Sequence, residues 1–174
     1  MVSLLRHRKK VTAAEIGTSL FLLAEDFSNK VNSTFRDLKH VRDAVDLAKL
    51  GNEIVYLVLF TIQTAIDMSL NDTDVKKRVR DEFRRHIRGM ASHASWFSEQ
   101  INERFCAYHD AIIECRDMPN CTLDDAVGMA FAKLCGSQCK TIDWGTLEQQ
   151  IEGKTIFGQA FKRVSEIIES SRVV

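Results

Sequence analysis

The stretch from residue 54 to residue 66, IVYLVLFTIQTAI, is the most apolar segment of the chain and decides its fold. It contains neither glycine nor proline, so nothing in it interrupts a helix. Its apolar side chains cover most of the helical circumference, which is typical of a helix surrounded by other helices. The segment is shorter than the roughly 20 residues that span a bilayer. We therefore expect a central, buried helix over residues 53–70.

Apolar residues on both sides of this segment recur at spacings of three and four. That period buries one stripe of a helix, whereas a half-buried strand alternates at every second residue. The chain contains a single proline, Pro119, and proline interrupts helices and sheets alike. The pattern predicts an all-α, single-domain bundle of about six helices around the central helix.

Two capping signals predict where helices begin. Thr12 and Glu15 have the spacing of a capping box, in which each side chain satisfies a backbone N–H of the other residue. Thr122 and Asp125 repeat this pattern, with Asp in the usual place of Glu. We expect one helix to begin just after each threonine.

Turn formers and glycines predict where helices stop. We expect a break at residues 29–32 and a C-terminal cap at Gly51. Residues 74–117 fit either one long bent helix or two consecutive helices. Residues 137–153 show little periodicity and are expected to form a loop with a helical turn or two, before a last helix over residues 155–170.

The 174 residues include 24 basic and 24 acidic side chains, so the formal net charge is zero. A neutral chain is not predicted to be attracted as a whole to nucleic acid or to an anionic membrane. We assign residues 12–174 to one helical domain and residues 1–11 to a basic, flexible tail with too few cations and leucines for stable membrane contact. The odd number of cysteines, five, and the lack of an uninterrupted apolar run at the start favour the cytoplasm.

Four segments together resemble a family of all-helical bacterial proteins to which no activity is assigned. The segments are VTAAEIG after a basic start (11–17), EIVYLVLFTIQTAI (53–66), GMAFAKLCG (128–136) and TIFGQAFKRVSEII (155–168). The resemblance covers most of the chain and rests chiefly on apolar positions. It implies a bacterial, cytoplasmic, helical protein and no particular chemistry.

One narrow polar line runs along the central helix. Glu53, Tyr56, Gln63 and Asp67 lie within an arc of about 80° on the helical wheel. If the line faces the bundle interior, two carboxylates, a phenol and an amide would line a small-ligand or ion site. If the line faces water, it is a solvated edge of the helix. The sequence leaves both alternatives open.

Cys106, His109, Cys135 and Cys139 form a second candidate site, because thiolate and imidazole are the ligands that zinc prefers. Their spacing, Cys-x-x-His and then Cys-x-x-x-Cys, is not that of a known zinc finger. The alternative is that the cysteines are free and pack as small apolar residues, as the apolar neighbours of Cys115 and Cys135 suggest. We expect no cofactor.

A dense basic segment follows the central helix. Most of its cations stand opposite the apolar face of their own helix and therefore cover one exposed side. This side is either a contact surface for a phosphate or an acidic partner, or a solvated face. The candidate patch consists of Lys77, Arg80, Arg84, Arg85 and Arg88.

These patterns favour a non-enzymatic, cytoplasmic interaction or adaptor protein that binds a protein partner or self-associates. The competing class is a small-ligand or metal sensor that uses the polar line or the Cys/His group. No nucleophile, acid and base can be placed together from the sequence, so an enzyme is the least favoured class. Nucleic acid is not expected as a partner, and no segment is long and apolar enough to be predicted as a transmembrane helix.

Overall fold

The apolar stretch lies in a helix, α3 (Leu47–Ser69), at the centre of the computed structural model, which describes residues 9–37, 47–91, 95–135 and 144–173. Side chains around the helix, including Ile54, Leu57, Val58 and Ile62, are fully buried. The remaining helices of the described residues are α1 (Ala13–Asp37), α4 (Thr73–Ala91), α5 (Ser95–Arg116), α6 (Leu123–Leu134) and α7 (Trp144–Ser170). The predicted all-α, single-domain bundle around a central helix is confirmed.

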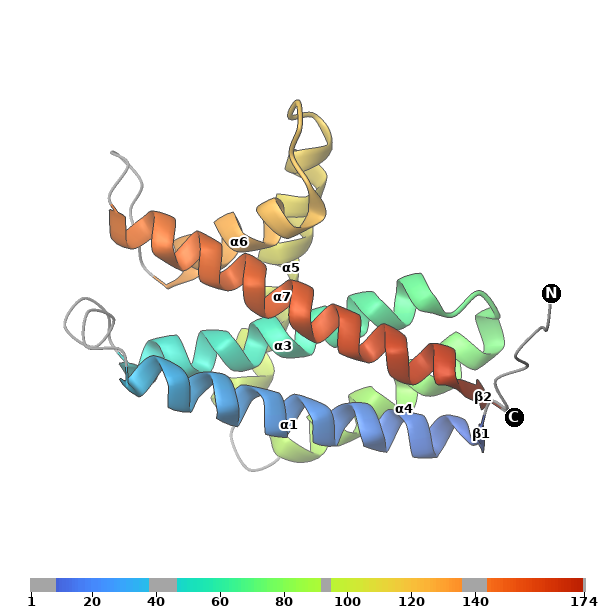
Figure 1. Ribbon diagram of the computed structural model, residues 1–174. Helices are drawn as coiled ribbons and strands as arrows, with labels where there is room; N and C mark the ends of the chain where they lie inside the picture. Colours follow the sequence, from blue (N-terminus) through green and yellow to red (C-terminus); the bar gives the residue numbers. More distant parts are fainter. Residues whose placement is uncertain (1–8, 38–46, 92–94, 136–143, 174) are drawn as a thin grey trace.

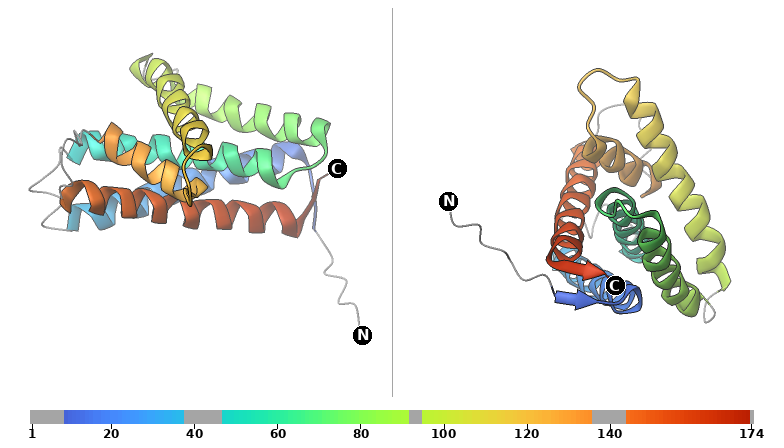
Figure 2. Two further views of the ribbon diagram at one scale, coloured as in Figure 1. Left: turned by 90° about the horizontal axis from the view of Figure 1, so that it is seen from above. Right: turned by 90° about the vertical axis from the view of Figure 1, so that its right-hand side faces the viewer.

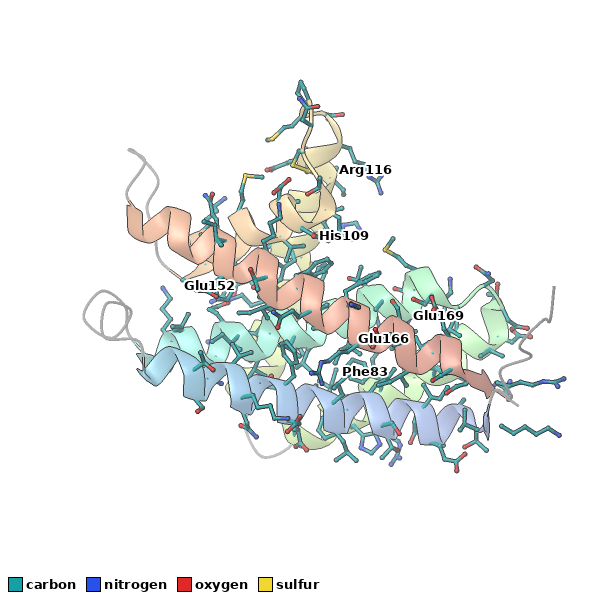
Figure 3. All side chains as sticks on the ribbon, viewed as in Figure 1. Phe83, His109, Arg116, Glu152, Glu166 and Glu169 are labelled. Atoms are coloured by element: carbon teal, nitrogen blue, oxygen red, sulfur yellow. A yellow bond between two sulfur atoms is a disulfide. The ribbon has the colours of Figure 1, made fainter. Side chains whose placement is uncertain are left out.

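Helices α1, α3, α4 and α7 run side by side along the long axis of the bundle (Figures 1 and 2). Helix α5 crosses this group, and its C-terminal half rises away from the bundle before the chain returns through α6 (Figure 1). Residues 74–117 are therefore divided between two helices, which answers the choice that the sequence left open. Phe83 of α4, labelled in Figure 3, is fully buried and belongs to the same hydrophobic core as Ile54 and Leu57.

Both predicted capping boxes are confirmed. The backbone N–H of Thr12 donates to Glu15 Oε2 at 2.7 Å, and the N–H of Glu15 donates to Thr12 Oγ1 at 3.1 Å. At the start of α6, the N–H of Thr122 donates to Asp125 Oδ2 at 3.1 Å, and the N–H of Asp125 donates to Thr122 Oγ1 at 3.2 Å. These bonds satisfy backbone donors that a helix start leaves without partners.

Glycines let helices approach closely at two junctions. A Cβ atom added to Gly128 of α6 would lie 2.5 Å from the backbone oxygen of Gln150 in α7. A Cβ atom added to Gly153 of α7 would lie 2.8 Å from the side chain of Phe131 in α6. Both distances are shorter than real contacts allow, so α6 and α7 pack this closely only because these residues lack side chains.

Three predicted helix boundaries are wrong. Helix α1 continues through residues 29–32, because packing of Phe27 and Val31 against the core outweighs the weak helix propensity of two asparagines. Gly51 lies inside α3 and does not cap a helix, and a Cβ atom there would lie 3.3 Å from Asn32 Oδ1. Helix α7 begins at Trp144, so the second half of the expected loop is helical.

The two ends of the described chain meet in a small sheet. Strand β1 (Lys9–Val11) pairs in parallel with strand β2 (Ser171–Val173), and Val11 is paired with Val173. The last three residues of the expected flexible tail are therefore part of the fold, whereas residues 1–8 lie outside the described residues. Among the helices of the described residues, none combines the length and the hydropathy needed to cross a membrane.

Candidate functional site

A groove lies where α3, α4 and α5 meet. Its volume is about 370 Å³, and it opens to solvent. Two arginines and two amide side chains form its polar part, and three apolar side chains form the rest. The lining residues are Gln63, Arg84, Ile87, Arg88, Ile101, Asn102 and Phe105.

The helical period of α4 explains how arginines reach this groove. Val79 and Phe83 are fully buried, and Ile87, which follows one turn later, is 6% exposed. Arg84 and Arg88 each come one position after a residue of this buried stripe, so they lie at its edge. The core side of α4 therefore positions these two guanidinium groups beside the groove.

The C-terminal half of the predicted polar line faces α4. Arg84 Nε donates to Gln63 Oε1 at 3.0 Å, and Arg80 forms an ion pair with Asp67. Lys76 Nζ also donates to the backbone oxygen of Asp67, at 2.7 Å. Of the four residues of the polar line, Gln63 is the one that lines the groove.

The N-terminal half of the polar line faces α5. Arg104 Nε donates to Glu53 Oε1 at 2.7 Å, and the hydroxyl of Tyr56 donates to Gln100 Oε1 at 3.1 Å. The side chain of Glu53 is 2% exposed and that of Arg104 is 16% exposed. The polar line is therefore buried at this end, but its two halves contact different helices and do not form one site.

Burial dominates the electrostatics around Glu53. Desolvation raises the pKa of Glu53, and the hydrogen bond and the charge of Arg104 oppose this increase only in part. Desolvation likewise raises the pKa of Tyr108, a fully buried residue of α5, well above its usual range. Neither Glu53 Oε2 nor the hydroxyl of Tyr108 has a hydrogen-bond partner among the described residues. Such orphaned groups cost free energy in a protein interior unless something satisfies them.

The structure does not gather three metal ligands from the described part of the Cys/His group. Cys106 and His109 are exposed on α5, and the label of His109 in Figure 3 shows it on the part of α5 that rises from the bundle. Cys135 is buried, and desolvation raises its pKa to about 12, which disfavours the thiolate that zinc requires. Cys139 lies outside the described residues. No group of three potential ligands that could hold a metal ion occurs among the residues that the structure describes.

Cys115 is not the free buried cysteine that the sequence suggested. Its sulfur is bonded to that of Cys121, with 5.6 Å between the two Cα atoms. The bond joins the end of α5 to the residue before the cap of α6. Between them, Asn120 has a positive φ of 62°, a conformation that asparagine adopts more readily than most residues. The disulfide therefore closes the tip of the segment that projects from the bundle (Figure 1).

We expect the cysteines to differ sharply in reactivity toward a thiol reagent. In a Cys139→Ser background, one thiol per native chain, that of Cys106, should react rapidly with Ellman's reagent. Cys135 should not react, because it is buried and its pKa is raised to about 12. Unfolding in guanidinium should expose Cys135, so that a second thiol per chain reacts. Two rapid equivalents from the native protein would contradict the burial of Cys135.

The cations of the predicted basic patch have different surroundings. Arg80 is paired with Asp67, and Arg85 Nε donates to Glu82 Oε2 at 3.0 Å. Arg88 borders the groove, and it also borders a second hollow between α1 and α4. Lys77 is exposed on α4. Two of the five predicted cations are thus occupied by fixed carboxylates, and two others line the groove.

Sequence reasoning missed the contribution of α5 to the groove. Ile101 and Phe105 were visible as part of an apolar stripe, but their position opposite α4 depends on the crossing of α5. Asn102 had no signal at all. The groove presents guanidinium groups, amides and an apolar surface, a combination that binds an anionic, partly apolar group.

Comparisons with protein-family models, with curated proteins and with solved structures found no match to this chain.

Proposed function

We propose that this protein is a non-enzymatic interaction module that binds an acidic protein partner through α4. The observation that carries this proposal is the charge of that helix, which has seven basic and three acidic residues, a surplus of four. Because the whole chain has 24 of each, the remaining residues carry a deficit of four. A concentrated positive surface on a neutral protein attracts a negatively charged surface and orients it on approach.

The position of the cations supports a specific surface rather than a uniformly solvated face. Arg84 and Arg88 border the groove between α3, α4 and α5, and Arg78, Arg85 and Arg88 border the hollow between α1 and α4. A solvated face needs no such concavities. Of the two, only the groove is lined by charges of one sign, and such a hollow concentrates the field and favours a partner of opposite charge.

The chemistry of the groove supports binding rather than catalysis. Guanidinium groups, amides and apolar side chains hold a partner, whereas hydrolysis or group transfer uses an activated nucleophile or a positioned acid and base. A protein partner is favoured over nucleic acid because no aromatic side chain is exposed on α4 for base stacking. We also propose that this protein is bacterial and cytoplasmic and belongs to the helical family that the four quoted segments resemble. An oxidised Cys115–Cys121 pair in cells would overturn the cytoplasmic location.

Selection of peptides from a random display library tests the proposed function. The wild-type protein should enrich acidic peptides, and the double variant Arg84→Glu with Arg88→Glu should lose at least about tenfold of that enrichment because it reverses two charges beside the groove. The matched control, Lys162→Glu with Arg163→Glu, makes the same charge change at two exposed positions of α7 and should retain the enrichment. Enrichment of peptides without acidic residues, or equal loss in both variants, would contradict the proposal.

A small-ligand sensor is the competing proposal, and one feature of the interior favours it. Glu53 Oε2 and the Tyr108 hydroxyl are both buried without a partner in the described structure, and a bound polar molecule would satisfy them. Native mass spectrometry distinguishes the two proposals. A small molecule that remains bound to the purified protein and is lost on denaturation would favour the sensor.

A further inference from the structure

We propose that the groove between α3, α4 and α5 receives an apolar side chain of the acidic partner, while Arg84 and Arg88 bind carboxylates next to it. This inference rests on the proposed function, because it specifies which acidic segment the basic surface of α4 recognises. Apolar anchors in pockets supply most of the affinity and selectivity of many protein interfaces, whereas exposed charges mainly guide association.

The apolar side of the groove provides a place for such an anchor. Ile87 and Ile101 are almost fully buried by the bundle, and Phe105 is half-buried and packs edge-on against Phe60. These side chains come from two crossing helices and are held by the core, so the surface exists before a partner arrives. A volume of about 370 Å³ is large enough for one or two side chains.

The polar side of the groove provides the carboxylate sites. Arg84 uses its Nε to bind Gln63, which fixes the plane of its guanidinium group. The two terminal nitrogens of the Arg84 guanidinium group remain able to bind a carboxylate in a bidentate manner. Arg88 follows one turn later, about 6 Å along the helix axis, so it suits a second carboxylate of the same segment. No carboxylate of the described residues lines this groove.

The second hollow of α4 lacks this combination. It lies against Ala13 and Ala14 of α1, and its lining includes the carboxylates of Asp81 and Glu82. Arg85 in this hollow already binds Glu82. An acidic partner would meet repulsion there as well as attraction, so the groove is the favoured position for the anchor.

The extent of the basic surface favours a peptide segment over a small molecule. The nineteen residues of α4 extend about 28 Å, and exposed Lys77 and Arg78 lie well beyond the groove. A small carboxylate would use only the groove. An acidic segment that places one apolar residue in the groove also reaches the cations along the helix.

Two fluorescein-labelled acidic peptides test this inference by fluorescence anisotropy. They have equal length and charge, and one has Phe-Leu at its centre where the other has Ala-Ala. We expect the Phe-Leu peptide to bind the wild-type protein about tenfold more tightly, because its anchor is removed from water. Asn102→Trp fills the groove from an exposed position and should remove most of that difference. Gln159→Trp, at an exposed position of α7, is the control and should retain it.

The outcomes separate this inference from the proposed function. Equal affinities of the two peptides, both weakened by Arg84→Glu with Arg88→Glu, would overturn the anchor and leave the basic surface in place. A tenfold preference that survives Asn102→Trp would place the anchor elsewhere and also overturn the inference. No binding of either peptide would remove the proposed function itself. Decanoate that binds more tightly than the Phe-Leu peptide, and is blocked by Asn102→Trp, would assign the groove to a small carboxylate instead.

Discussion

Replacement of Arg104 by methionine is expected to lower the free energy of unfolding by about 3 kcal/mol at neutral pH. The side chain of Glu53 is 2% exposed, and the bond from Arg104 Nε to Oε1, 2.7 Å long, joins its carboxylate to the guanidinium group. Methionine fills a similar volume without a charge, so the variant leaves a buried carboxylate without its cation. Burial of an unpaired charge is among the most costly single changes in a protein. Chemical denaturation at neutral pH measures the effect.

The dependence of this loss on pH follows from the raised pKa of Glu53. The folded protein holds the proton of Glu53 more tightly than the unfolded chain does. The stability contributed by that proton is complete below the unfolded pKa and is lost as the pH rises through the folded pKa. Without Arg104 the folded pKa rises further, so the difference between variant and wild type should shrink as the pH falls into the acidic range.

Two further substitutions show whether the Glu53 charge causes the loss. Adding Glu53→Gln to Arg104→Met should restore more than half of the lost stability, because it removes the charge. Glu103→Gln is the matched control. Glu103 is the other carboxylate bound to Arg104, but its side chain is 71% exposed, so its loss should cost less than about 0.5 kcal/mol. An Arg104→Met protein as stable as the wild type at neutral pH would show that Glu53 is not a buried charge.

Alanine at Gly128 is expected to lower the free energy of unfolding by about 2 kcal/mol, although alanine is the better helix former. The added Cβ would lie 2.5 Å from the backbone oxygen of Gln150 and 3.3 Å from the Cβ of Lys154. Backbone cannot move aside as the end of a flexible side chain does, so α6 and α7 must separate. Thermal unfolding followed by circular dichroism measures the change.

Gly89 provides the control for this substitution. It also lies within a helix, α4, but a Cβ atom added there meets nothing within 4 Å. Gly89→Ala should therefore stabilise the protein by about 0.5 to 1 kcal/mol through helix propensity alone. If Gly128→Ala stabilised the protein as Gly89→Ala does, the close packing of α6 on α7 would be wrong.

At the candidate sites, sequence patterns predicted features within one helix but not the contacts between helices. The period of α4 correctly placed Val79 and Phe83 on its buried face, because that is a property of one helix. The wheel of α3 also placed Glu53 and Asp67 on one face. It could not show that α5 covers the first and α4 the second, because no local pattern encodes the crossing of helices.

Local patterns along the chain determined the helical character of this protein, the buried central helix and the two capping boxes. They act within one helix or one turn, where period, propensity and capping bonds are set by neighbouring residues. Only the tertiary structure decided that Gly51 lies inside a helix, that Arg104 reaches Glu53, and that Asn102 joins two arginines of α4 around one groove. These features depend on which helices touch, and that choice is made by the packing of the whole core.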